Sequence, residues 1–489
     1  MESSERSNSR DRVVVVGSGL SGLAAARRLV VRGQGQRRPP EVVVLEARDR
    51  IGGAIWTDRR DGFTLEGGAD SFITNKPWAV ELCREIGLGD SLIGTDDRNR
   101  RSFVVRGGKL LPVPEGFVLM APSRIGPLLA SPILSLRGKL RVLLDLIVPR
   151  KADDSDESLA AFVRRRLGRE ALERLVQPLV GGIYTADPAD LSLKATLPQF
   201  PAMEREHGSL IRGARRQARQ VRSADRSASG ARYGLFASLA DGMDSLPKAL
   251  AASLPPRTIR TSAAVRRIGR ADPSQPWRVE MLDGPPIEAG TVILTTEAHA
   301  SARLLDGYDP ELALQLRSIP YASSAIVTVA YRRDRVAHPL DGFGAVVPAI
   351  EGRSILAISF LSVKFPTRAP SGTALMRVFV GGATQPGLFD LDDEEIKGRV
   401  RAELAGLLGA SGEPILSEVA RHPRAMPQYT LGHLDRVAAI RQRAGRHPGL
   451  ILAGNAFHGV GIPDCVRSGQ DAADATLSAL ADPAAPAAA

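Results

Sequence analysis

The fold of this chain is decided by the stretch Val13-Val14-Val15-Val16-Gly17-Ser18-Gly19-Leu20-Ser21-Gly22. Four consecutive valines predict a strand that is buried on both faces, and an alanine-rich helix is expected after the glycine-rich turn. A second apolar strand, Val42-Val43-Val44-Leu45, follows and ends at Glu46. Strand, turn, helix and strand in this order make a βαβ unit, so we expect an α/β fold with a parallel sheet.

The glycines of this turn have the spacing Gly-x-Gly-x-x-Gly, which is typical of dinucleotide-binding folds. Gly17 permits the tight turn, Gly19 lets the backbone approach a pyrophosphate, and Gly22 lets the helix pack close to the sheet. The helix N-terminus offers unpaired N–H groups and a partial positive charge to the phosphates. Glu46 can accept hydrogen bonds from the ribose hydroxyls and would repel a 2′-phosphate, which disfavours NADP. The alternative is a Rossmann-like unit that binds nothing.

The residues after Glu46 favour one dinucleotide over another. The run Ala47-Arg48-Asp49-Arg50-Ile51-Gly52-Gly53-Ala54 keeps basic residues and a second glycine pair beside the phosphate site. This run resembles the extended fingerprint of the two-domain flavoproteins that include amine oxidases, phytoene desaturases and protoporphyrinogen oxidases. The resemblance implies a non-covalently bound FAD rather than NAD.

Composition and residue patterns exclude several other classes of protein. The chain has 489 residues, of which 43% are hydrophobic and 24% charged, as expected for two or three globular domains. Cys83 and Cys465 form no Cys-x-x-Cys pair and the seven histidines are scattered, so we predict neither a metal site nor a disulfide framework. The formal net charge is +11, but arginine is spread along the chain without interleaved aromatic residues, so no nucleic acid partner is expected.

The polarity of the chain also bears on its location. Its N-terminal residues are polar and charged, and no charge-free apolar run reaches the length of a membrane-spanning helix, so we expect a cytoplasmic protein. From Pro114 to Lys151, short apolar patches alternate with basic residues. This pattern is typical of segments that lie on a membrane surface, here the inner face. The alternative is an amphipathic helix whose apolar face belongs to a protein core.

Segments later in the chain predict a second, mixed sheet and a discontinuous first domain. Alternating or β-branched runs at 326–331, 344–347, 355–360 and 375–380 are expected to be its strands. A buried strand at 449–454, followed by glycines and a helix, indicates that the first domain closes with C-terminal residues. We therefore expect a Rossmann-like FAD-binding domain of residues 1–75, 233–270 and 440–489, a substrate-binding domain of 76–100 and 271–439, and a mostly helical domain of 101–232 for membrane contact or substrate access.

Segments along nearly the whole chain resemble the protoporphyrinogen oxidase family. The most selective are Pro427-Gln428-Tyr429-Thr430-Leu431-Gly432-His433 and the stretch 453–469, which reads A-G-N-x-x-x-G-V-G-x-x-D-C-x-x-S-G. Pro178 with Gly182-Ile183-Tyr184, and Phe379-Val380-Gly381-Gly382, match the family as well. These stretches are far more selective than a glycine-rich turn.

The resemblance implies contacts for both cofactor and substrate. Phe343, Gly344, Val346 and Phe379 are expected to line the substrate slot, although periodicity alone would assign them to a sheet core. FAD is expected to contact Gly17, Ser18, Gly19, Leu20, Ser21, Gly22, Glu46, Ala47, Arg48, Gly52, Gly53, Gly68, Ala69, Asp70, Ser71, Val265, Gly454, Asn455, Val460, Gly461 and Ile462.

The family's activity is the oxidation of a porphyrinogen in haem biosynthesis. The resemblance implies first the six-electron oxidation of protoporphyrinogen IX to protoporphyrin IX, by hydride transfer to FAD and with O₂ as acceptor. Coproporphyrinogen III is the alternative, because residues 114–119 lack an arginine that some relatives carry there. No catalytic residue is assigned, and Arg101, Arg106 and Lys109 are candidates to bind the propionates. Ferrochelatase and a second copy of the chain are further expected partners.

Two other classes remain as alternatives. A flavin amine oxidase would typically show an aromatic pair near the flavin and often a cysteine that tethers it, whereas here Phe457 stands alone and Cys465 follows Asp464 rather than a glycine pair. A non-enzymatic relative, as in the Rab GDP-dissociation inhibitors, would share the fold without FAD.

Overall fold

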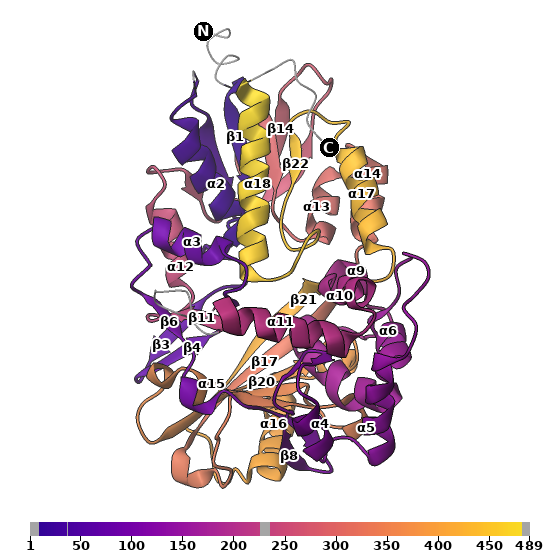
Figure 1. Ribbon diagram of the computed structural model, residues 1–489. Helices are drawn as coiled ribbons and strands as arrows, with labels where there is room; N and C mark the ends of the chain where they lie inside the picture. The colour runs from indigo at the N-terminus through magenta and orange to yellow at the C-terminus, as the bar shows by residue number, and fades with distance from the viewer. Residues whose placement is uncertain (1–8, 37, 225–234, 482–489) are drawn as a thin grey trace.

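The structure is a computed structural model that describes residues 9–36, 38–224 and 235–481. The predicted domain ranges also contain residues 1–8, 37, 225–234 and 482–489, and for these the prediction lies outside the described part of the chain. The described chain forms two main sheets with helices beside them (Figure 1). One sheet is parallel and the other mixed, so the predicted fold class is confirmed.

The valine-rich strand lies at the centre of the parallel sheet, as predicted. The strand order is β12-β2-β1-β16-β22, and every neighbouring pair is parallel. Val13, Val14 and Val15 are fully buried, because both faces of the sheet are covered. The strands span Ile259–Arg260 (β12), Glu41–Leu45 (β2), Arg12–Val16 (β1), Thr291–Leu294 (β16) and Leu450–Leu452 (β22).

Two different layers cover this sheet. Because side chains alternate along a strand, Val13 and Val15 pack with one layer, and Val14 and Val16 with the other. The first layer contains α2 (Leu20–Gly33), α3 (Trp78–Glu85), α12 (Ser245–Ala252) and α18 (Ile462–Ala481). The second contains β13 (Val265–Gly269), β14 (Trp277–Met281), β15 (Ile287–Ala289), α13 (Ala298–Leu305), α14 (Pro310–Arg317) and α17 (His433–Ala444).

The parallel sheet includes residues that we expected in the substrate domain. β16 pairs with β1 and β22, and α13 and α14 pack against the same sheet. The predicted domain range 271–439 is therefore wrong for β14, β15 and β16, for these two helices and for the start of α17. A short apolar strand such as Thr-Val-Ile-Leu suits a buried parallel sheet and a mixed sheet equally well, so its sequence does not assign it.

The second sheet has the strand order β21-β17-β20-β19-β18-β7-β8, and among its neighbouring pairs only β18 and β7 are parallel. The prediction missed β21, whose sequence is polar and contains two prolines. It also assigned the hairpin at 102–112 to the helical domain, whereas this hairpin forms the edge of the sheet. The strands span Leu416–Pro427 (β21), Tyr321–Arg332 (β17), Thr373–Gly381 (β20), Ala357–Phe360 (β19), Gly344–Val346 (β18), Ser102–Arg106 (β7) and Lys109–Pro112 (β8).

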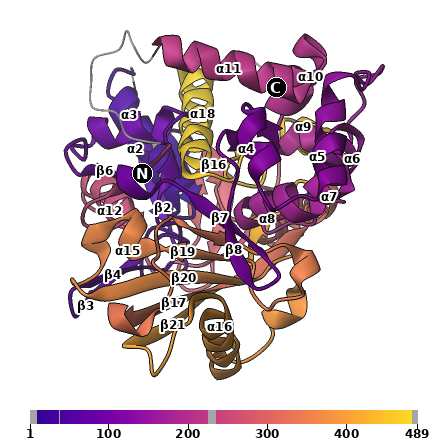
Figure 2. The same cartoon turned by 60° about the horizontal axis from the view of Figure 1, so that its bottom comes forward.

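One face of the second sheet is closed by the helix α16 (Asp393–Leu408), which Figure 2 shows on one side of the strands. The buried cluster on this side contains residues of the central strands together with four leucines, isoleucines and valines from one stripe of α16: Phe103, Val105, Ala325, Val327, Ala345, Ile358, Phe360, Met376, Val378, Val380, Ile396, Val400, Leu404 and Leu407. The core of the substrate-side sheet therefore lies under α16.

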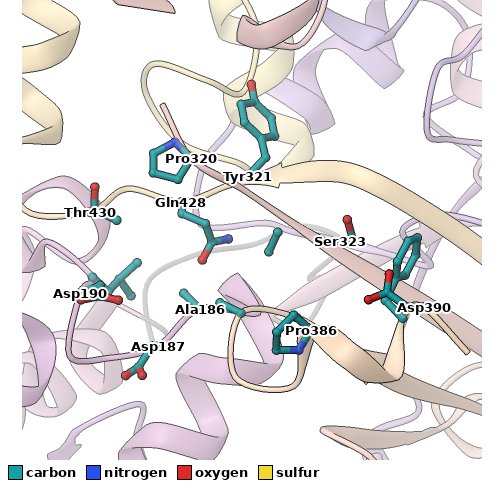
Figure 3. A pocket seen from close by; sticks show the side chains of 15 residues that line it. Ala186, Asp187, Asp190, Pro320, Tyr321, Ser323, Pro386, Asp390, Gln428 and Thr430 are labelled. Carbon is teal, nitrogen blue, oxygen red and sulfur yellow. The ribbon is translucent and has the colours of Figure 1, made fainter. Parts of the chain in front are cut away.

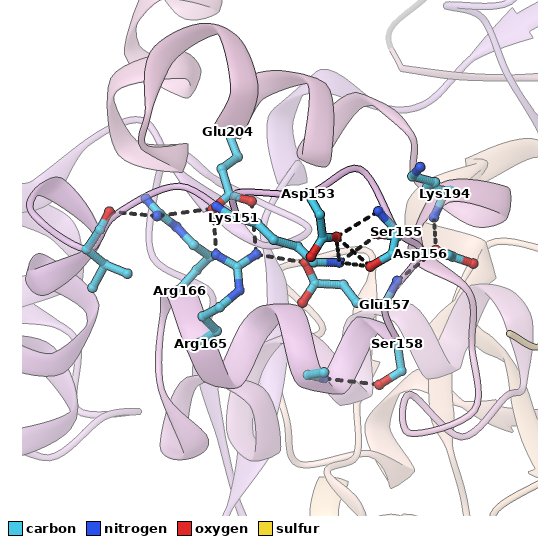
Figure 4. A network of polar contacts seen from close by, with 12 residues as sticks. Lys151, Asp153, Ser155, Asp156, Glu157, Ser158, Arg165, Arg166, Lys194 and Glu204 are labelled. Atoms are coloured by element: carbon cyan, nitrogen blue, oxygen red, sulfur yellow. Dashed lines mark hydrogen bonds and ion pairs between the residues drawn. The ribbon is translucent and has the colours of Figure 1, made fainter.

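Between β8 and residue 224 the chain is mostly helical, as predicted, and encloses its own apolar cluster. Arg166 is fully buried there and donates to Asp145 (2.7 Å), while Glu204 lies between Arg165 and Arg166 (Figure 4). Searched over the described residues, the structure contains no helix that is long and apolar enough to span a membrane. The helices are α4 (Ile125–Ala130), α5 (Leu136–Leu143), η2 (Leu144–Leu146), α6 (Leu159–Arg166), α7 (Arg169–Ala171), η3 (Leu172–Val176), α8 (Gln177–Tyr184), α9 (Leu193–Thr196), α10 (Gln199–His207) and α11 (Leu210–Ala224).

Candidate functional site

The predicted cofactor residues meet at the carboxyl edge of the parallel sheet, where ligands bind in folds of this class. The turn 17–22 follows β1, Glu46 follows β2, and Gly454 follows β22 within two residues. Gly17 has a φ of +102°, which L side chains rarely adopt, and so reverses the chain directly after β1. Three loops that are far apart in the sequence thus share one edge.

The start of α2 leaves open space of the kind a pyrophosphate needs. Gly19 precedes the helix, and a Cβ atom added to it would meet no atom within 4 Å. A Cβ atom on Gly22, by contrast, would lie 2.0 Å from the carbonyl oxygen of Gly17. Gly22 is therefore required by packing, whereas Gly19 borders space that the protein itself does not fill. The residues present fit a bound dinucleotide phosphate.

Glu46 is held at the end of β2 by the neighbouring loops. Its Oε2 accepts hydrogen bonds from the backbone N–H and the hydroxyl of Ser18 at 2.9 and 2.6 Å, and its Oε1 accepts from the N–H of Arg48 at 3.0 Å. A carboxylate offers about four acceptor positions, so Glu46 retains capacity for a ribose hydroxyl. The N–H of Ala263 donates to the carbonyl of Glu46 (2.8 Å), which places the start of β13, and with it Val265, beside this loop.

The second glycine pair, Gly52-Gly53, packs against the glycine-rich turn 17–22. The segment 67–71 packs against the residue that follows this pair. A Cβ atom on Gly53 would lie 3.2 Å from the Cα atom of Gly19, and the N–H of Gly52 donates to the carbonyl of Ser18 (2.9 Å). A Cβ atom on Gly68 would lie 2.1 Å from the carbonyl oxygen of Ala54, directly after this pair. Ala47, Arg48 and Ala69 are exposed along the same edge.

The helix α18, near the C-terminus, contacts the glycine-rich turn and the helix α2 near the N-terminus. The hydroxyl of Ser21 donates to the carbonyl of Cys465 (2.9 Å), and a Cβ atom on Gly469 would lie 2.1 Å from the carbonyl oxygen of Ser21. Helices α2 and α18 therefore touch through their backbones, and Figure 1 shows them side by side. This contact brings residues 460–462, at the start of α18, to the edge that carries the glycine-rich turn.

Side chains of the motif Pro427–His433 contact the backbone of the loop after β22. The hydroxyl of Tyr429 donates to the carbonyl of Asn455 (2.6 Å), and the ring of His433 stacks on that of Tyr429 with 3.9 Å between centroids. The Nε2 atom of His433 lies 3.2 Å from the carbonyl oxygen of Phe457. This motif, found through family resemblance alone, thus positions the C-terminal cofactor loop. Burial lowers the pKa of His433 to about 4.

We expect His433 to make the protein lose stability in weak acid. The unfolded chain binds a proton at His433 below about pH 6.5, whereas the folded chain resists protonation until about pH 4. Stability therefore falls as the pH drops through this window, by up to about 3 kcal/mol. Urea unfolding between pH 7 and 4 measures this loss.

A His433→Gln variant, which cannot titrate, serves as the control for that measurement. Its stability should depend less steeply on pH over the same window, although it is lower at pH 7 because the stacking on Tyr429 changes. Equal slopes for the variant and the parent protein would show that other groups cause the acid sensitivity.

Strand register places two predicted substrate residues on one face. Val346 pairs with Ala357, and Ala357 pairs with Phe379, so these three side chains form a row across β18, β19 and β20. The intervening residues Ala345, Ile358 and Val378 belong to the cluster under α16. Val346 and Phe379 therefore face away from the cluster under α16. Val346 packs at the edge of the apolar cluster of the helical region, whereas Phe379 belongs to none of the buried apolar clusters.

Phe343 does not join this row. Its carbonyl accepts a hydrogen bond from the N–H of Phe360 (2.9 Å), and Phe360 is buried in the cluster under α16. Because side chains alternate along a strand, Phe343 lies on the core side of the sheet while Gly344 lies on the other. The structure thus separates Phe343 from the three residues predicted with it.

The sequence reasoning did not name Gly182 as a site residue, although it quoted the motif around it. Gly182 is exposed near the end of α8, and a Cβ atom on it would lie 3.7 Å from Cγ1 of Val346. The helix α8 therefore forms a wall opposite the Val346–Phe379 row. The spacing of Pro178 and Gly182-Ile183-Tyr184 is the signal that could have identified it.

The basic residues proposed for propionates lie elsewhere. Arg106 and Lys109 pair at the tip of the hairpin β7–β8, and β7 is three strands from β20, about 14 Å away at the usual strand spacing. Arg106 donates to the carbonyl of Pro132, and Arg101 pairs with Asp341 at 3.1 Å. The structure does not bring these three cations to Phe379.

A cavity of about 400 Å³ lies between residues 186–191, residues 320–323 and the segment 382–390 (Figure 3). Asp187, Asp190 and Asp390 line it together with Gln428 and Tyr321. None of the predicted cofactor or substrate residues is among its lining residues. This cavity is therefore separate from the predicted cofactor and substrate residues.

A glycine-rich turn at the carboxyl edge of a parallel sheet is typical of folds that bind a dinucleotide. The sequence pattern of the family described as flavin containing amine oxidoreductase matches residues 20–477. The chain belongs to this family and is therefore a flavin-dependent oxidoreductase.

Individual proteins similar to this chain carry more specific names than the family does. The coproporphyrinogen III oxidase of Propionibacterium freudenreichii is 37% identical over 97% of this chain and 92% of its own length. The chloroplastic protoporphyrinogen oxidase of Oryza sativa is 31% identical over 94% of this chain and 87% of its own length. A crystal structure from Exiguobacterium sp. 255-15, provisionally named protoporphyrinogen oxidase, is 32% identical, covers 95% of this chain and 98% of its own, and has a TM-score of 0.83. The predicted family resemblance is confirmed.

Proposed function

We propose that this chain binds FAD without a covalent link and oxidises a porphyrinogen to the corresponding porphyrin in haem biosynthesis. The observation that carries the proposal is the Val346–Phe379 row, which lies on the face of the sheet turned away from α16; on the same face, Arg377 reaches the predicted cofactor segment at Gly68. A flat, largely apolar macrocycle suits a wall of this kind. The names of the relatives agree with this activity.

Coproporphyrinogen III is the substrate that we favour, ahead of protoporphyrinogen IX. Three bacterial relatives named coproporphyrinogen III oxidase, from Propionibacterium freudenreichii, Bacillus subtilis and Staphylococcus aureus, are 37%, 32% and 31% identical to this chain. The plant relatives named protoporphyrinogen oxidase reach at most 31% among those compared. The absence of arginine from residues 114–119 points the same way.

The chain's own residues would bind and orient the reactants. Gly19 and the N-terminus of α2 would hold the pyrophosphate, Glu46 the ribose, and the loop before α18 the remainder of the cofactor. When bound, FAD would supply the redox chemistry: six electrons and six protons would leave the porphyrinogen in three two-electron oxidations, and three O₂ would be reduced to three H₂O₂. Val346, Phe379 and Gly182 would hold one bridge carbon of the macrocycle in position and exclude water.

The experiment that tests this function compares both porphyrinogens, prepared anaerobically, by porphyrin fluorescence after air is admitted. We expect coproporphyrin III to form with kcat/KM at least ten-fold above that for protoporphyrin IX. A reversed preference would assign protoporphyrinogen IX as the substrate. If neither porphyrin forms with flavin-replete protein, the proposal is wrong.

We also propose that α5 and η2 contact a membrane surface. Leu136, Leu140, Leu144 and Ile147 are 72%, 55%, 44% and 75% exposed and recur at helical spacing, so they form one apolar stripe. Exposed leucines on a single stripe are unusual for a soluble helix, whose apolar stripe faces inward. Arg137 is exposed beside the stripe and Lys139 lies between its first two leucines, where each could add about 1 kcal/mol on an anionic bilayer.

A Leu140→Glu variant is expected to lose most of its binding to vesicles that contain anionic lipid, because insertion of one leucine is worth about 1.5–3 kcal/mol. Vesicle co-sedimentation measures the effect. Leu314→Glu is a matched control, because Leu314 is 65% exposed on α14, outside the stripe. Equal sedimentation of the parent protein and both variants would refute the membrane contact.

The cytoplasmic location and the contacts with ferrochelatase and a second copy of the chain stay predictions.

A further inference from the structure

Three side chains, two from the mixed sheet and one from the neighbouring helix α15 (Leu361–Lys364), contact the segment 67–71, which we predict to bind the cofactor. Arg377 of β20 donates to the carbonyl of Gly68 and pairs with Asp70 at 3.0 Å. Lys364, at the end of α15, lies 2.9 Å from the same carboxylate. The Nε2 atom of His422, on β21, lies 2.8 Å from the carbonyl oxygen of Gly67.

Arg377 stands at the centre of this contact. It is 1% exposed and lies two residues before Phe379 on the same face of β20, with its guanidinium 5.6 Å from the Phe379 ring. One side chain thus touches both the predicted substrate wall and the predicted cofactor segment. Its Nε atom is buried without a hydrogen-bond partner among the described residues.

The charges in this contact do not cancel. Arg377 and Lys364 face a single carboxylate, Asp70, and the nearby Glu66 pairs with Arg368 at 3.3 Å. Burial lowers the pKa of His422, so this ring adds no charge near neutral pH. Although burial acts to raise it, the pKa of Asp70 is held well below its usual value by Lys364 and Arg377. The contact therefore carries a net positive charge in a region of low dielectric constant.

We propose that Arg377 is a positioning residue that fixes the segment 67–71 against the cofactor and places a buried positive charge beside it. This inference rests on the proposed function and adds to it the link between substrate wall and cofactor segment. Loss of the guanidinium would free the carbonyl of Gly68 and leave Asp70 with only Lys364. A buried positive charge also stabilises the more negative, reduced state of a neighbouring cofactor.

The test is titration of the apoprotein with FAD and measurement of the flavin's midpoint potential in the holoprotein. Arg377→Met is expected to weaken FAD binding at least ten-fold and to shift the potential to more negative values. Arg377→Lys keeps the charge but loses the fork geometry, so it should restore most of the potential and only part of the affinity. If Arg377→Met does not fold, Arg377→Gln keeps the measurement possible, because its amide N–H can still donate a hydrogen bond while the side chain carries no charge.

Arg166→Met is the matched control, since Arg166 is equally buried and ion-paired but lies in the helical region (Figure 4). It should lower stability while the folded fraction keeps the parent's FAD affinity and potential. Unchanged affinity and potential in Arg377→Met, or an unchanged potential in Arg377→Gln if only that variant folds, would overturn the inference while the parent still binds FAD. A parent protein that binds no FAD would instead overturn the proposed function.

Discussion

A Gly19→Ala variant is expected to fold like the parent protein and to lose most of its flavin. Gly19 has a φ of −66° and a ψ of 176°, which alanine adopts freely, and an added Cβ atom meets nothing within 4 Å. The methyl group would instead occupy the space that a pyrophosphate needs. We expect the flavin affinity to fall roughly 10- to 100-fold, at about 1.4 kcal/mol for each factor of ten. Fluorescence titration of the apoprotein with FAD measures this loss.

Gly22→Ala provides the contrast for this prediction. Its Cβ atom would lie 2.0 Å from the carbonyl oxygen of Gly17, so the helix α2 must shift away from the turn. This variant should lose thermal stability even as the apoprotein, whereas Gly19→Ala should keep the apoprotein's melting temperature. Full flavin occupancy in Gly19→Ala would mean that the cofactor phosphates do not bind at this turn.

The second large effect is expected from Phe379→Ala. Phe379 lies on the face of β20 turned away from α16 and belongs to none of the buried apolar clusters, so its removal should cost little stability. As part of the substrate wall, however, its ring would hold the macrocycle in place. We expect kcat/KM for porphyrinogen oxidation to fall roughly 10- to 100-fold, or about 1.4–2.8 kcal/mol of transition-state stabilisation. Steady-state fluorescence assays measure it, with flavin content checked by absorbance.

Phe360→Ala tests the same substitution on the other face of the sheet. Phe360 is fully buried under α16 on the adjacent strand β19, so truncation should cost about 3–5 kcal/mol of stability. The two variants should therefore differ in kind: one loses turnover and the other loses stability. If Phe379→Ala keeps normal kinetics, or unfolds as readily as Phe360→Ala, Phe379 is a core residue.

The contacts of Pro427–His433 explain why this selective motif matters for the site although it contains no predicted cofactor residue. Tyr429 and His433 contact the carbonyls of Asn455 and Phe457, so Pro427–His433 supports the loop that precedes α18. His433 is fully buried and stacked on Tyr429, which indicates a supporting role for this motif. Family resemblance located the motif, and the hydrogen bonds show what it does.

Errors in the sequence-based prediction have a common physical origin. β16 and the strand runs of the mixed sheet are all short and apolar, and β21 has too polar a sequence to be recognised as a strand. Which strands become neighbours depends on pairing between residues that are far apart along the chain. Likewise, the alternation around Val346 and Phe379 shows two faces but does not show which one α16 covers.

The sequence by itself determined the parallel βαβ unit, its dinucleotide turn, the second glycine pair and the family, because each depends on contiguous residues whose local conformation and spacing have few solutions. Only the tertiary structure decided which face of the mixed sheet α16 covers, that Gly19 borders open space while Gly22 does not, and that Arg377 reaches Gly68 and Asp70. Those facts depend on how separate layers pack, and packing brings together residues that no local pattern relates.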